Sequence, residues 1–385
     1  MEKNSSNLIF CRAKIPDGNL GDVFLTKILV NELRSYGKLI VEDQRVPEWY
    51  CQELELTSDE RASNYEVKFK NLILISSLRA LFLLNPNKIY LIHQPGHWAG
   101  RSRFLNVVKT MLFLCLLRII GVRFCVLGIS LGFMPTLTQF LWQWKFKMSY
   151  FFSVRDSISK DYAHKIGIDK VSIFPDLAWL IEKPHYDSIS PLKVDGDYVV
   201  FSFRKAPTDW DESTEYSAEY NHNLLVLLDE IVKLLCSNKS KKLVISYQVD
   251  KDRKFCQEMY DKYKNIYNVV FIERQIDSKC MWDLYSRASM VFSNRLHVLM
   301  FAMACGSLPV AIINEVNQHK IAGIFLDAGL KELILDIGKS SSGIEDLIKI
   351  AADAERIKEK ISLSYESRQN SGKALLKQIF NEGLN

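Results

Sequence analysis

The most informative stretch of this chain is Ser289-Met-Val-Phe-Ser-Asn-Arg-Leu-His-Val-Leu-Met-Phe-Ala-Met-Ala-Cys-Gly306. Its apolar start predicts a short buried strand, which ends at the polar pair Ser293 and Asn294. Ser or Asn just before an apolar run is a helix N-cap signal, and Gly just after one is a C-cap signal. A helix is therefore expected from about Arg295 to Gly306, with another buried strand after it. Strand, helix and strand in this order form the repeating unit of a parallel α/β sheet.

The start of this helix indicates what kind of ligand the chain binds. Arg295 and His297 fall in the first helical turn, at the carboxyl end of the preceding strand. Unpaired backbone N–H groups and the helix dipole favour an anion at that place. Cationic side chains in a first turn oppose the dipole and need a compensating partner. A bound phosphate or carboxylate would supply that partner.

The same unit recurs along the chain and predicts two doubly wound, Rossmann-like α/β domains. A chain of 385 residues is too long for one ordinary core. The pattern lapses in a Pro-, Asp- and Ser-rich segment, which indicates a linker at residues 186–197 between domains at residues 1–185 and 198–385. A central cleft is expected between the carboxyl ends of the two sheets. The expected elements include strands at 122–129 and 198–203, helices at 103–120, 223–236 and 252–263, and a mostly helical segment at 322–385.

The composition and motifs of the chain indicate neither nucleic acid nor a metal ion as a binding partner. The chain is 48% hydrophobic and 25% charged without low-complexity tracts, which is typical of a globular protein. Its net charge of +5 is too small to indicate nucleic acid, and no basic run is interleaved with stacking aromatics. Nucleic-acid binding is therefore not expected. Neither an H-E-x-x-H motif nor a cluster of His and Asp ligands occurs, so no metal site is expected.

Cysteine spacing and hydropathy indicate a cytoplasmic protein. The eight cysteines show no paired or metal-finger spacing, which favours reduced, buried thiols. The N-terminus lacks the pattern of a signal peptide. The most hydrophobic stretch, Phe104–Met134, is interrupted by three basic residues. Its longest charge-free part, Thr110–Leu117, is too short to span a bilayer. A buried core helix is the favoured interpretation. The alternative is a helix that rests on the inner face of the plasma membrane, with Arg101–Arg123 as the place of contact.

Two arginines and one glycine-rich loop fall at strand carboxyl ends. Arg204 follows the first strand of the second domain, and Arg295 begins the later helix, so both can converge on one anion. Two planar guanidinium groups suit a small ligand that carries both carboxylate and phosphate. In the first domain the loop Asp17–Asp22 could cradle a sugar or a phosphate. It is neither a Walker loop nor a dinucleotide-binding fingerprint, so alone it is weakly specific.

Taken together, these residues resemble the polysaccharide pyruvyl transferase family, over nearly the whole chain. The ordered set is anchored by Arg-Leu-His and by Val-Arg-Asp-Ser. The matching positions are Gly18-Asn-Leu-Gly-Asp22, Gly128-Ile-Ser-Leu-Gly132, Ser153-Val-Arg-Asp-Ser157, Lys165-Ile-Gly167, Phe174-Pro-Asp176, Ser202-Phe-Arg204, Gln248–Asp250, Asn294-Arg-Leu-His297, Gly306-Ser-Leu-Pro309 and Lys320.

The resemblance implies a GT-B-like fold and transfer of the pyruvyl group of phosphoenolpyruvate to two hydroxyls of a sugar, forming a cyclic ketal. No cofactor is implied beyond this donor substrate. It also implies that four residues hold phosphoenolpyruvate, namely Arg204, Arg295, Leu296 and His297. Many members carry a run of glycines where this chain has Gln94–Gly100. Because that loop faces the acceptor, the departure leaves the acceptor sugar open.

The residue types suit that chemistry. His297 is the natural proton donor or phosphate ligand, because imidazole gains and loses a proton near neutral pH. Asp22 could accept the proton of the acceptor hydroxyl. The remaining substrate contacts are expected from Asn294 on the donor side and from Gly18, Asn19, Gly21, His97 and Trp98 on the acceptor side.

Each of these residues also has a purely structural interpretation. Arg295 and His297 could cap a neighbouring helix or pair with carboxylates, and Asp22 could be a helix N-cap. Arg204 could be an ordinary surface or interface arginine. Arg155-Asp156 is expected to form a structural pair at a strand-to-helix turn. Asp195-Gly-Asp197, with the spacing of a metal-binding Asp-x-Asp, reads as a turn.

The expected function is a pyruvyl transferase that modifies a sugar of a bacterial-type exopolysaccharide or capsule, or its lipid-linked precursor. It would act at the cytoplasmic side of the membrane. The rival enzyme is a GT-B glycosyltransferase with a nucleotide-sugar donor, although no acidic residue is clearly placed to bind a ribose. A third interpretation is a glycan-binding or scaffold protein without turnover.

Overall fold

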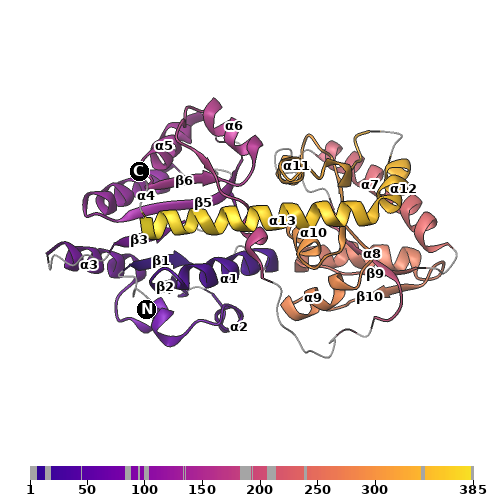
Figure 1. Ribbon diagram of the computed structural model, residues 1–385, viewed down its shortest axis with the longest axis horizontal. Coiled ribbons are helices and arrows are strands. Elements are labelled where there is room, and N and C mark those ends of the chain that lie inside the picture. Colours follow the sequence, from indigo (N-terminus) through magenta and orange to yellow (C-terminus); the bar gives the residue numbers. More distant parts are fainter. Residues whose placement is uncertain are drawn as a thin grey trace. The chain divides into compact units, whose positions relative to one another are not determined.

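The chain folds into two compact α/β units in a computed structural model (Figure 1). Unit 1 comprises Met1–Asp17, Asp22–Leu180 and Gln369–Asn385, and unit 2 comprises Gly18–Gly21 and Ile181–Arg368. The structure describes residues 7–13, 19–44, 46–82, 88–93, 96–98, 104–132, 134, 136–182, 192, 194–205, 214–237, 241–339 and 343–382. Each unit is built around its own parallel sheet, as the recurring strand–helix pattern predicts.

Unit 1 contains a parallel sheet in the order β2-β1-β3-β5-β6-β7, with β4 paired to β5. Its strands are β1 (Leu8–Arg12), β2 (Lys38–Glu42), β3 (Ile89–Ile92), β4 (Gly96–Trp98), β5 (Arg123–Leu131), β6 (Phe151–Val154) and β7 (Ser172–Ile173). Its helices are α1 (Leu20–Arg34), α2 (Glu48–Glu53), α3 (Phe69–Phe82), α4 (Phe104–Ile119), α5 (Thr136–Lys147) and α6 (Ser157–Lys165). The winding direction reverses between β1 and β3, so the sheet is doubly wound.

Apolar side chains of α3, α4 and α5 form one core with the sheet of unit 1. The ring of Phe69 in α3 packs edge-on against Phe10 of β1, with 5.8 Å between the centroids. The end of the chain completes unit 1, since Phe380 stacks on Tyr36 and the Tyr90 hydroxyl donates to the carbonyl of Ile379.

Unit 2 contains a parallel sheet in the order β10-β9-β8-β11-β12-β13. Its strands are β8 (Tyr198–Ser202), β9 (Lys242–Ile245), β10 (Val269–Phe271), β11 (Met290–Ser293), β12 (Leu308–Ile313) and β13 (Ile334–Asp336). Its helices are α7 (Thr214–Cys236), α8 (Arg253–Tyr263), α9 (Ser278–Ser286), α10 (Leu296–Ala304), α11 (His319–Asp327) and α12 (Gly343–Ala352), and α13 (Ala354–Lys377) crosses into unit 1. The winding direction reverses between β8 and β11.

The unit boundaries differ from the predicted domain boundaries. Unit 2 begins at Ile181, and much of the expected linker at 186–197 lies outside the described residues. The prediction placed all of residues 198–385 in the second domain, but Gln369–Asn385 belongs to unit 1. Sequence periodicity predicts a helix but does not show against which hydrophobic core it packs. The sequence therefore could not show that the last part of α13 belongs to unit 1.

Most of the glycine segment Gly128-Ile-Ser-Leu-Gly132 lies inside the strand predicted at 122–129. The prediction ended the strand at residue 129, yet β5 continues to Leu131. Gly128 adopts φ +57°, and the register with β6 shifts at this point. The hydroxyl of Ser153 accepts from the Gly128 N–H and donates to the carbonyl of Val126. Gly128 therefore allows a β-bulge, which only a residue tolerant of positive φ adopts without strain.

The structure bears on two predictions, one about the cysteines and one about membrane-spanning helices. All eight cysteines are free and seven are buried, as the lack of paired spacing predicts. Among the helices described, none has the length and apolar character needed to cross a membrane.

Lys145 is a buried cation in the core of unit 1, with only 4% of its surface exposed. Its Nζ lies 4.9 Å from the ring centroid of Trp142 and 5.3 Å from that of Phe146. Burial, with a smaller repulsion from Arg12, lowers the pKa of Lys145 to about 7. In the unfolded chain a lysine titrates near pH 10.4. The unfolded state therefore binds more protons between about pH 7 and pH 10, and Lys145 lowers stability most at and below pH 7.

We predict that Lys145→Met raises the free energy of unfolding by about 1–4 kcal/mol at pH 7, because it removes a buried charge. The gain should shrink steadily toward pH 10, where the native lysine is neutral. Urea unfolding at several pH values measures both effects. Lys147→Met, at an exposed position of the same helix, is the matched control and should change little. A gain that does not depend on pH would contradict the assignment.

Candidate functional site

The sequence-predicted arginines lie at the point where the sheet of unit 2 reverses its winding. β8 and β11 are neighbours in parallel register, with Ser202 opposite Ser293. Arg204 follows β8 by two residues and Arg295 follows β11 by two residues. Loops that leave adjacent parallel strands at such a reversal diverge and open a ligand crevice at the carboxyl edge. The topology therefore brings the two arginine-bearing loops to one place.

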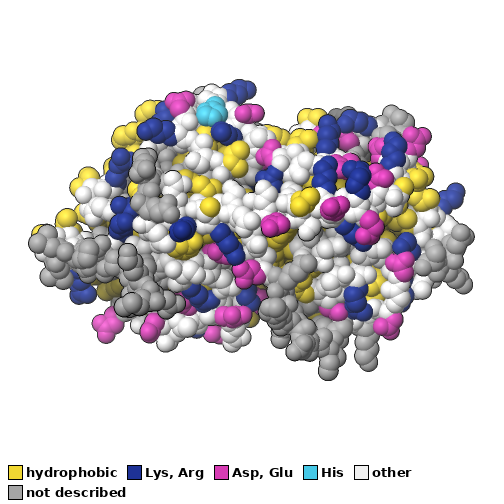
Figure 2. Space-filling view, in the orientation of Figure 1, with side chains coloured by type: hydrophobic (Ala, Val, Ile, Leu, Met, Phe, Trp, Pro, Cys, Tyr) yellow, Lys and Arg dark blue, Asp and Glu magenta, His cyan; other side chains and the backbone are white. Residues whose placement is uncertain are grey.

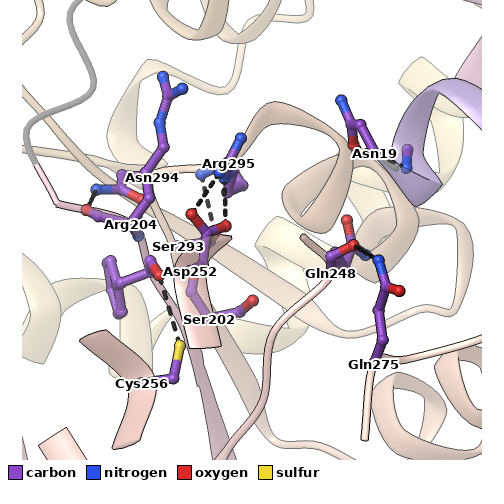
Figure 3. A network of polar contacts seen from close by, with 12 residues as sticks. Asn19, Ser202, Arg204, Gln248, Asp252, Cys256, Gln275, Ser293, Asn294 and Arg295 are labelled. Carbon is purple, nitrogen blue, oxygen red and sulfur yellow. Dashed lines mark hydrogen bonds and ion pairs between the residues drawn. The ribbon is translucent and has the colours of Figure 1, made fainter. Parts of the chain in front are cut away.

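Asn294 joins these two loops through its side-chain amide (Figure 3). Its Oδ1 accepts from the Arg204 backbone N–H at 3.0 Å, and its Nδ2 donates to the Arg204 carbonyl at 2.9 Å. Nδ2 also donates to the Tyr220 hydroxyl at 3.0 Å. Asn294 is completely buried. Its amide thus holds the backbone of Arg204 in place, a positioning role that differs from the substrate contact expected of it.

Arg295 forms a two-pronged ion pair with Asp252 (Figure 3). Its Nε donates to Asp252 Oδ2 at 2.9 Å and its Nη2 to Oδ1 at 2.5 Å. Both side chains are largely buried, with 16% and 7% exposed. Among the described residues, no hydrogen bond occupies Nη1 of Arg295. The carboxylate therefore fixes the plane of the guanidinium and leaves one edge of it available.

The start of α10 presents further groups at the same edge of the sheet. Arg295 occupies the N-cap position, and its backbone N–H donates to the Ser293 hydroxyl at 2.9 Å. Leu296 and His297 are half-buried in the first turn. The imidazole of His297 lies 6.2 Å from the ring of Phe301, one helical turn along. The predicted helix start is therefore confirmed, with Arg295 just before the first turn rather than within it.

Part of the predicted glycine loop belongs to this site by its contacts. Asn19 and Gly21 group with unit 2, and the Asn19 side chain accepts from the Gly21 backbone N–H at 3.1 Å. A Cβ built on Gly21 would come within 2.5 Å of His297 Nδ1. Only glycine fits at such a separation, so Gly21 gives room to the imidazole. Gly18 lies outside the described residues.

The acceptor-side predictions fall in unit 1, except for this loop. Asp22 lies in the first turn of α1, half-buried, and a Cβ on Gly96 would lie 3.9 Å from its Oδ1. His97 and Trp98 are in β4, the short strand that follows β3. Asp22 and β4 thus border the point between β1 and β3 where the sheet of unit 1 reverses its winding.

Three supporting residues were missed by the sequence analysis. Asp252 lies just before α8, in the loop region after β9, the strand next to β8. Tyr220 belongs to α7, whose first nine residues precede the predicted start. Gln318 accepts from the Tyr220 hydroxyl at 3.1 Å and from the Asn314 backbone N–H at 3.0 Å. An acidic residue at a helix start after a strand is the one signal that could have found Asp252.

The remaining polar motifs have structural roles. Arg155 pairs with Asp176 at 2.5 Å, not with the adjacent Asp156, and both partners are buried. Asp156 is the N-cap of α6 and accepts from the Ser159 N–H at 2.7 Å, as expected of a residue at that turn. Asp197, from the Asp-x-Asp sequence, pairs with Lys241 at 2.5 Å. Within the described residues, no group of three or more His, Cys, Asp or Glu side chains could hold a metal ion.

The candidate site in unit 2 brings together, at a sheet reversal, two loops that each carry an arginine and a helix start that carries an imidazole. Such an arrangement can bind a small anion with more than one negative group, and can deliver or accept a proton beside it.

Comparison with solved structures shows the GT-B fold that the resemblance implies. The UDP-GlcNAc 2-epimerase of Neisseria meningitidis bound to UDP-GlcNAc is 12% identical, with a TM-score of 0.55 over 96% of this chain and 98% of that one. The epimerase of Methanocaldococcus jannaschii is 14% identical, with a TM-score of 0.50 and the same coverages. The alpha,alpha-trehalose-phosphate synthase (UDP-forming) of Burkholderia vietnamiensis is 11% identical, with a TM-score of 0.51 over 97% and 98%. Identities this low show the fold alone.

Sequence comparison identifies the family. No curated protein matches the chain in sequence. The family model described as polysaccharide pyruvyl transferase matches residues 19–313, which include both arginine-bearing loops of unit 2 and β4 of unit 1. Because that match covers most of the 385 residues, this chain belongs to the polysaccharide pyruvyl transferase family.

Proposed function

We propose that the protein transfers the pyruvyl group of phosphoenolpyruvate to two hydroxyls of a sugar in a surface polysaccharide or its lipid-linked precursor. One observation carries the proposal: Arg204 and Arg295 leave adjacent parallel strands at the reversal point of one sheet, beside the start of α10. Phosphoenolpyruvate carries its carboxylate and its phosphate on the same carbon, C2. Two guanidinium groups and backbone N–H groups suit these two anionic ends.

The reaction requires one proton at carbon and gives one phosphate. A proton adds to the methylene carbon, so C2 becomes an oxocarbenium-like centre. One sugar hydroxyl adds to C2 and loses its proton, and the bond from C2 to the phosphate oxygen breaks with its electron pair going to phosphate. The second hydroxyl then adds to C2 and loses its proton, which closes the ketal ring. The two released protons balance the one at carbon and the one taken up by phosphate.

Each step has a candidate group in this chain. His297 is the proton donor to the methylene carbon or a ligand of the phosphate, because it stands in the first turn of α10 next to Arg295. Arg204 and the available edge of Arg295 would stabilise the carboxylate and the departing phosphate. Asp22 is the candidate base for the acceptor hydroxyl. β4, with His97 and Trp98, is the candidate acceptor contact.

A glycosyltransferase or epimerase reaction with a nucleotide-sugar donor is the alternative. It is supported by the UDP-sugar enzymes that share this fold. However, at sequence identities of 11–14% a shared fold does not establish a shared substrate. Asp252, the acidic residue at this edge of the sheet, is already engaged in an ion pair with Arg295. The donor that binds decides between the two functions.

We predict saturable binding of phosphoenolpyruvate that Arg204→Ala and Arg295→Ala each weaken at least tenfold, because a hydrogen bond to a charged group contributes about 1.5–3 kcal/mol. Calorimetry and thermal shift with phosphoenolpyruvate and UDP-GlcNAc measure this. Arg356→Ala is the matched control, since Arg356 is an exposed arginine of unit 2 paired with Asp353. Binding of UDP-GlcNAc with no response to phosphoenolpyruvate would favour the glycosyltransferase.

The substitution Asp252→Asn tests whether the negative charge of Asp252 or its orientation of the Arg295 guanidinium matters for anion binding. The asparagine keeps one acceptor oxygen for the guanidinium and removes a negative charge near the bound anion, so we expect phosphoenolpyruvate to bind at least as tightly as to the native protein. The dissociation constant from calorimetry measures this. If the substitution weakens binding as much as Arg295→Ala does, then the Asp252–Arg295 pair is needed intact and the remaining edge of Arg295 is not a sufficient anion ligand.

His297→Gln should separate binding from turnover. Glutamine keeps a hydrogen-bonding group but cannot transfer a proton near neutral pH, so we expect phosphoenolpyruvate affinity within about threefold and turnover lowered about 100-fold or more. Phosphate release with any acceptor that the native protein uses measures turnover. Loss of affinity with turnover of the bound complex unchanged would instead assign His297 to the phosphate.

A further inference from the structure

Helix α4 is apolar on two opposite sides. One side packs into the core of unit 1 through Val107, Met111, Leu114 and Leu117. The other side carries side chains that are 45–80% exposed, namely Leu105, Leu112, Leu116 and Ile119. At 3.6 residues per turn, the two sets lie about half a turn apart around the helix axis. The two sequence-based interpretations of this stretch therefore describe its two sides, one in the core and one at the surface.

Helix α5 extends the exposed apolar side of α4. The two helices pack against each other. Arg118 of α4 donates to the carbonyl of Met148, just after α5, at 2.8 Å. Phe140 and Trp144, one turn apart on α5, are 68% and 49% exposed. We call these six residues the α4–α5 apolar face: Leu105, Leu112, Leu116, Ile119, Phe140 and Trp144.

The segment that contains this face carries only one sign of charge. Residues 67–155 contain twelve Lys and Arg and no Asp or Glu. Since the whole chain has a net charge of only +5, the rest of it is net negative. Exposed basic residues on α3, α4 and α5 include Lys70, Arg79, Lys109, Arg118 and Lys147. Figure 2 shows dark blue basic groups interspersed with yellow hydrophobic ones over the part of unit 1 that carries α4 and α5.

From this combination we infer that the α4–α5 apolar face docks on a lipid bilayer with anionic headgroups. Apolar side chains enter the acyl boundary, and long basic side chains reach the headgroups from the same helices. Each Lys or Arg near an anionic surface adds about 1 kcal/mol of attraction. Trp144 is suited to the interface, where indole is favoured. A second copy of this chain fits less well, because it would bring two basic surfaces together.

The inference does not depend on the proposed reaction, because lipid binding is measured without donor or acceptor. The full chain is mixed with vesicles of phosphatidylcholine alone, or with about one third phosphatidylglycerol, and sedimented. We expect binding to the anionic vesicles at least tenfold stronger than to the neutral ones, and weakened by 0.5 M salt. The double variant Leu112→Ser/Ile119→Ser should bind the anionic vesicles at least tenfold more weakly.

Matched controls test whether the face itself matters. Ile266→Ser/Leu363→Ser replaces two apolar residues of unit 2 that are 68% and 63% exposed, and should bind like the native chain. Thermal melting checks that both double variants are folded. Equal binding by both variants, or no binding of the native chain to anionic vesicles, would overturn the inference. So would a dimer in light scattering that only Leu112→Ser/Ile119→Ser dissociates, since the face would then be an interface between copies.

Discussion

The site of unit 2 depends on the pairing of one side-chain amide with one backbone unit. Asn294 follows β11, and its amide bonds both the N–H and the carbonyl of Arg204, which follows the neighbouring strand β8. The side-chain amide thus bonds to the backbone of the next loop as a neighbouring strand would. It keeps together two loops that would otherwise diverge. Each such hydrogen bond contributes about 0.5–1.5 kcal/mol net, and a buried amide left without them would cost more. The arginine side chains begin from a backbone that is already fixed.

The fold was largely predictable because its signals are local. Buried strands, amphipathic helices and glycines at helix ends recur in order, and each sheet is parallel as that order requires. The sequence could not show against which neighbouring structure a helix or strand packs. The divided helix α13 and the bulge at Gly128 both depend on which surfaces meet in three dimensions. A helical period is compatible with packing in either unit, and a glycine is compatible with a turn as well as with a bulge.

The arginines were predictable for a similar reason, and their partners were not. A parallel sheet places residues after neighbouring strands at one edge, so the sequence predicted that Arg204 and Arg295 follow strands at the same edge. Asp252 enters the site from a third strand, β9, and Tyr220 from a helix that begins in a sequence without clear periodicity. Side-chain pairing of this kind leaves no regular spacing. Asn294, which has the residue type of a ligand contact, supports the backbone of Arg204.

The carboxylate of Asp252 has a consequence for any anion bound beside it. It offsets the positive charge of Arg295, so it must weaken the attraction of the site for an anion. In return it fixes the orientation of Arg295, and a guanidinium that is already oriented loses less side-chain entropy when it binds. A transferase must also release its product. If phosphate leaves from this site, moderate charge with fixed geometry favours turnover more than a strongly cationic, mobile pair of arginines would. The ion pair is thus compatible with a binding role for Arg295, because orientation rather than maximal charge is what a repeated transfer requires.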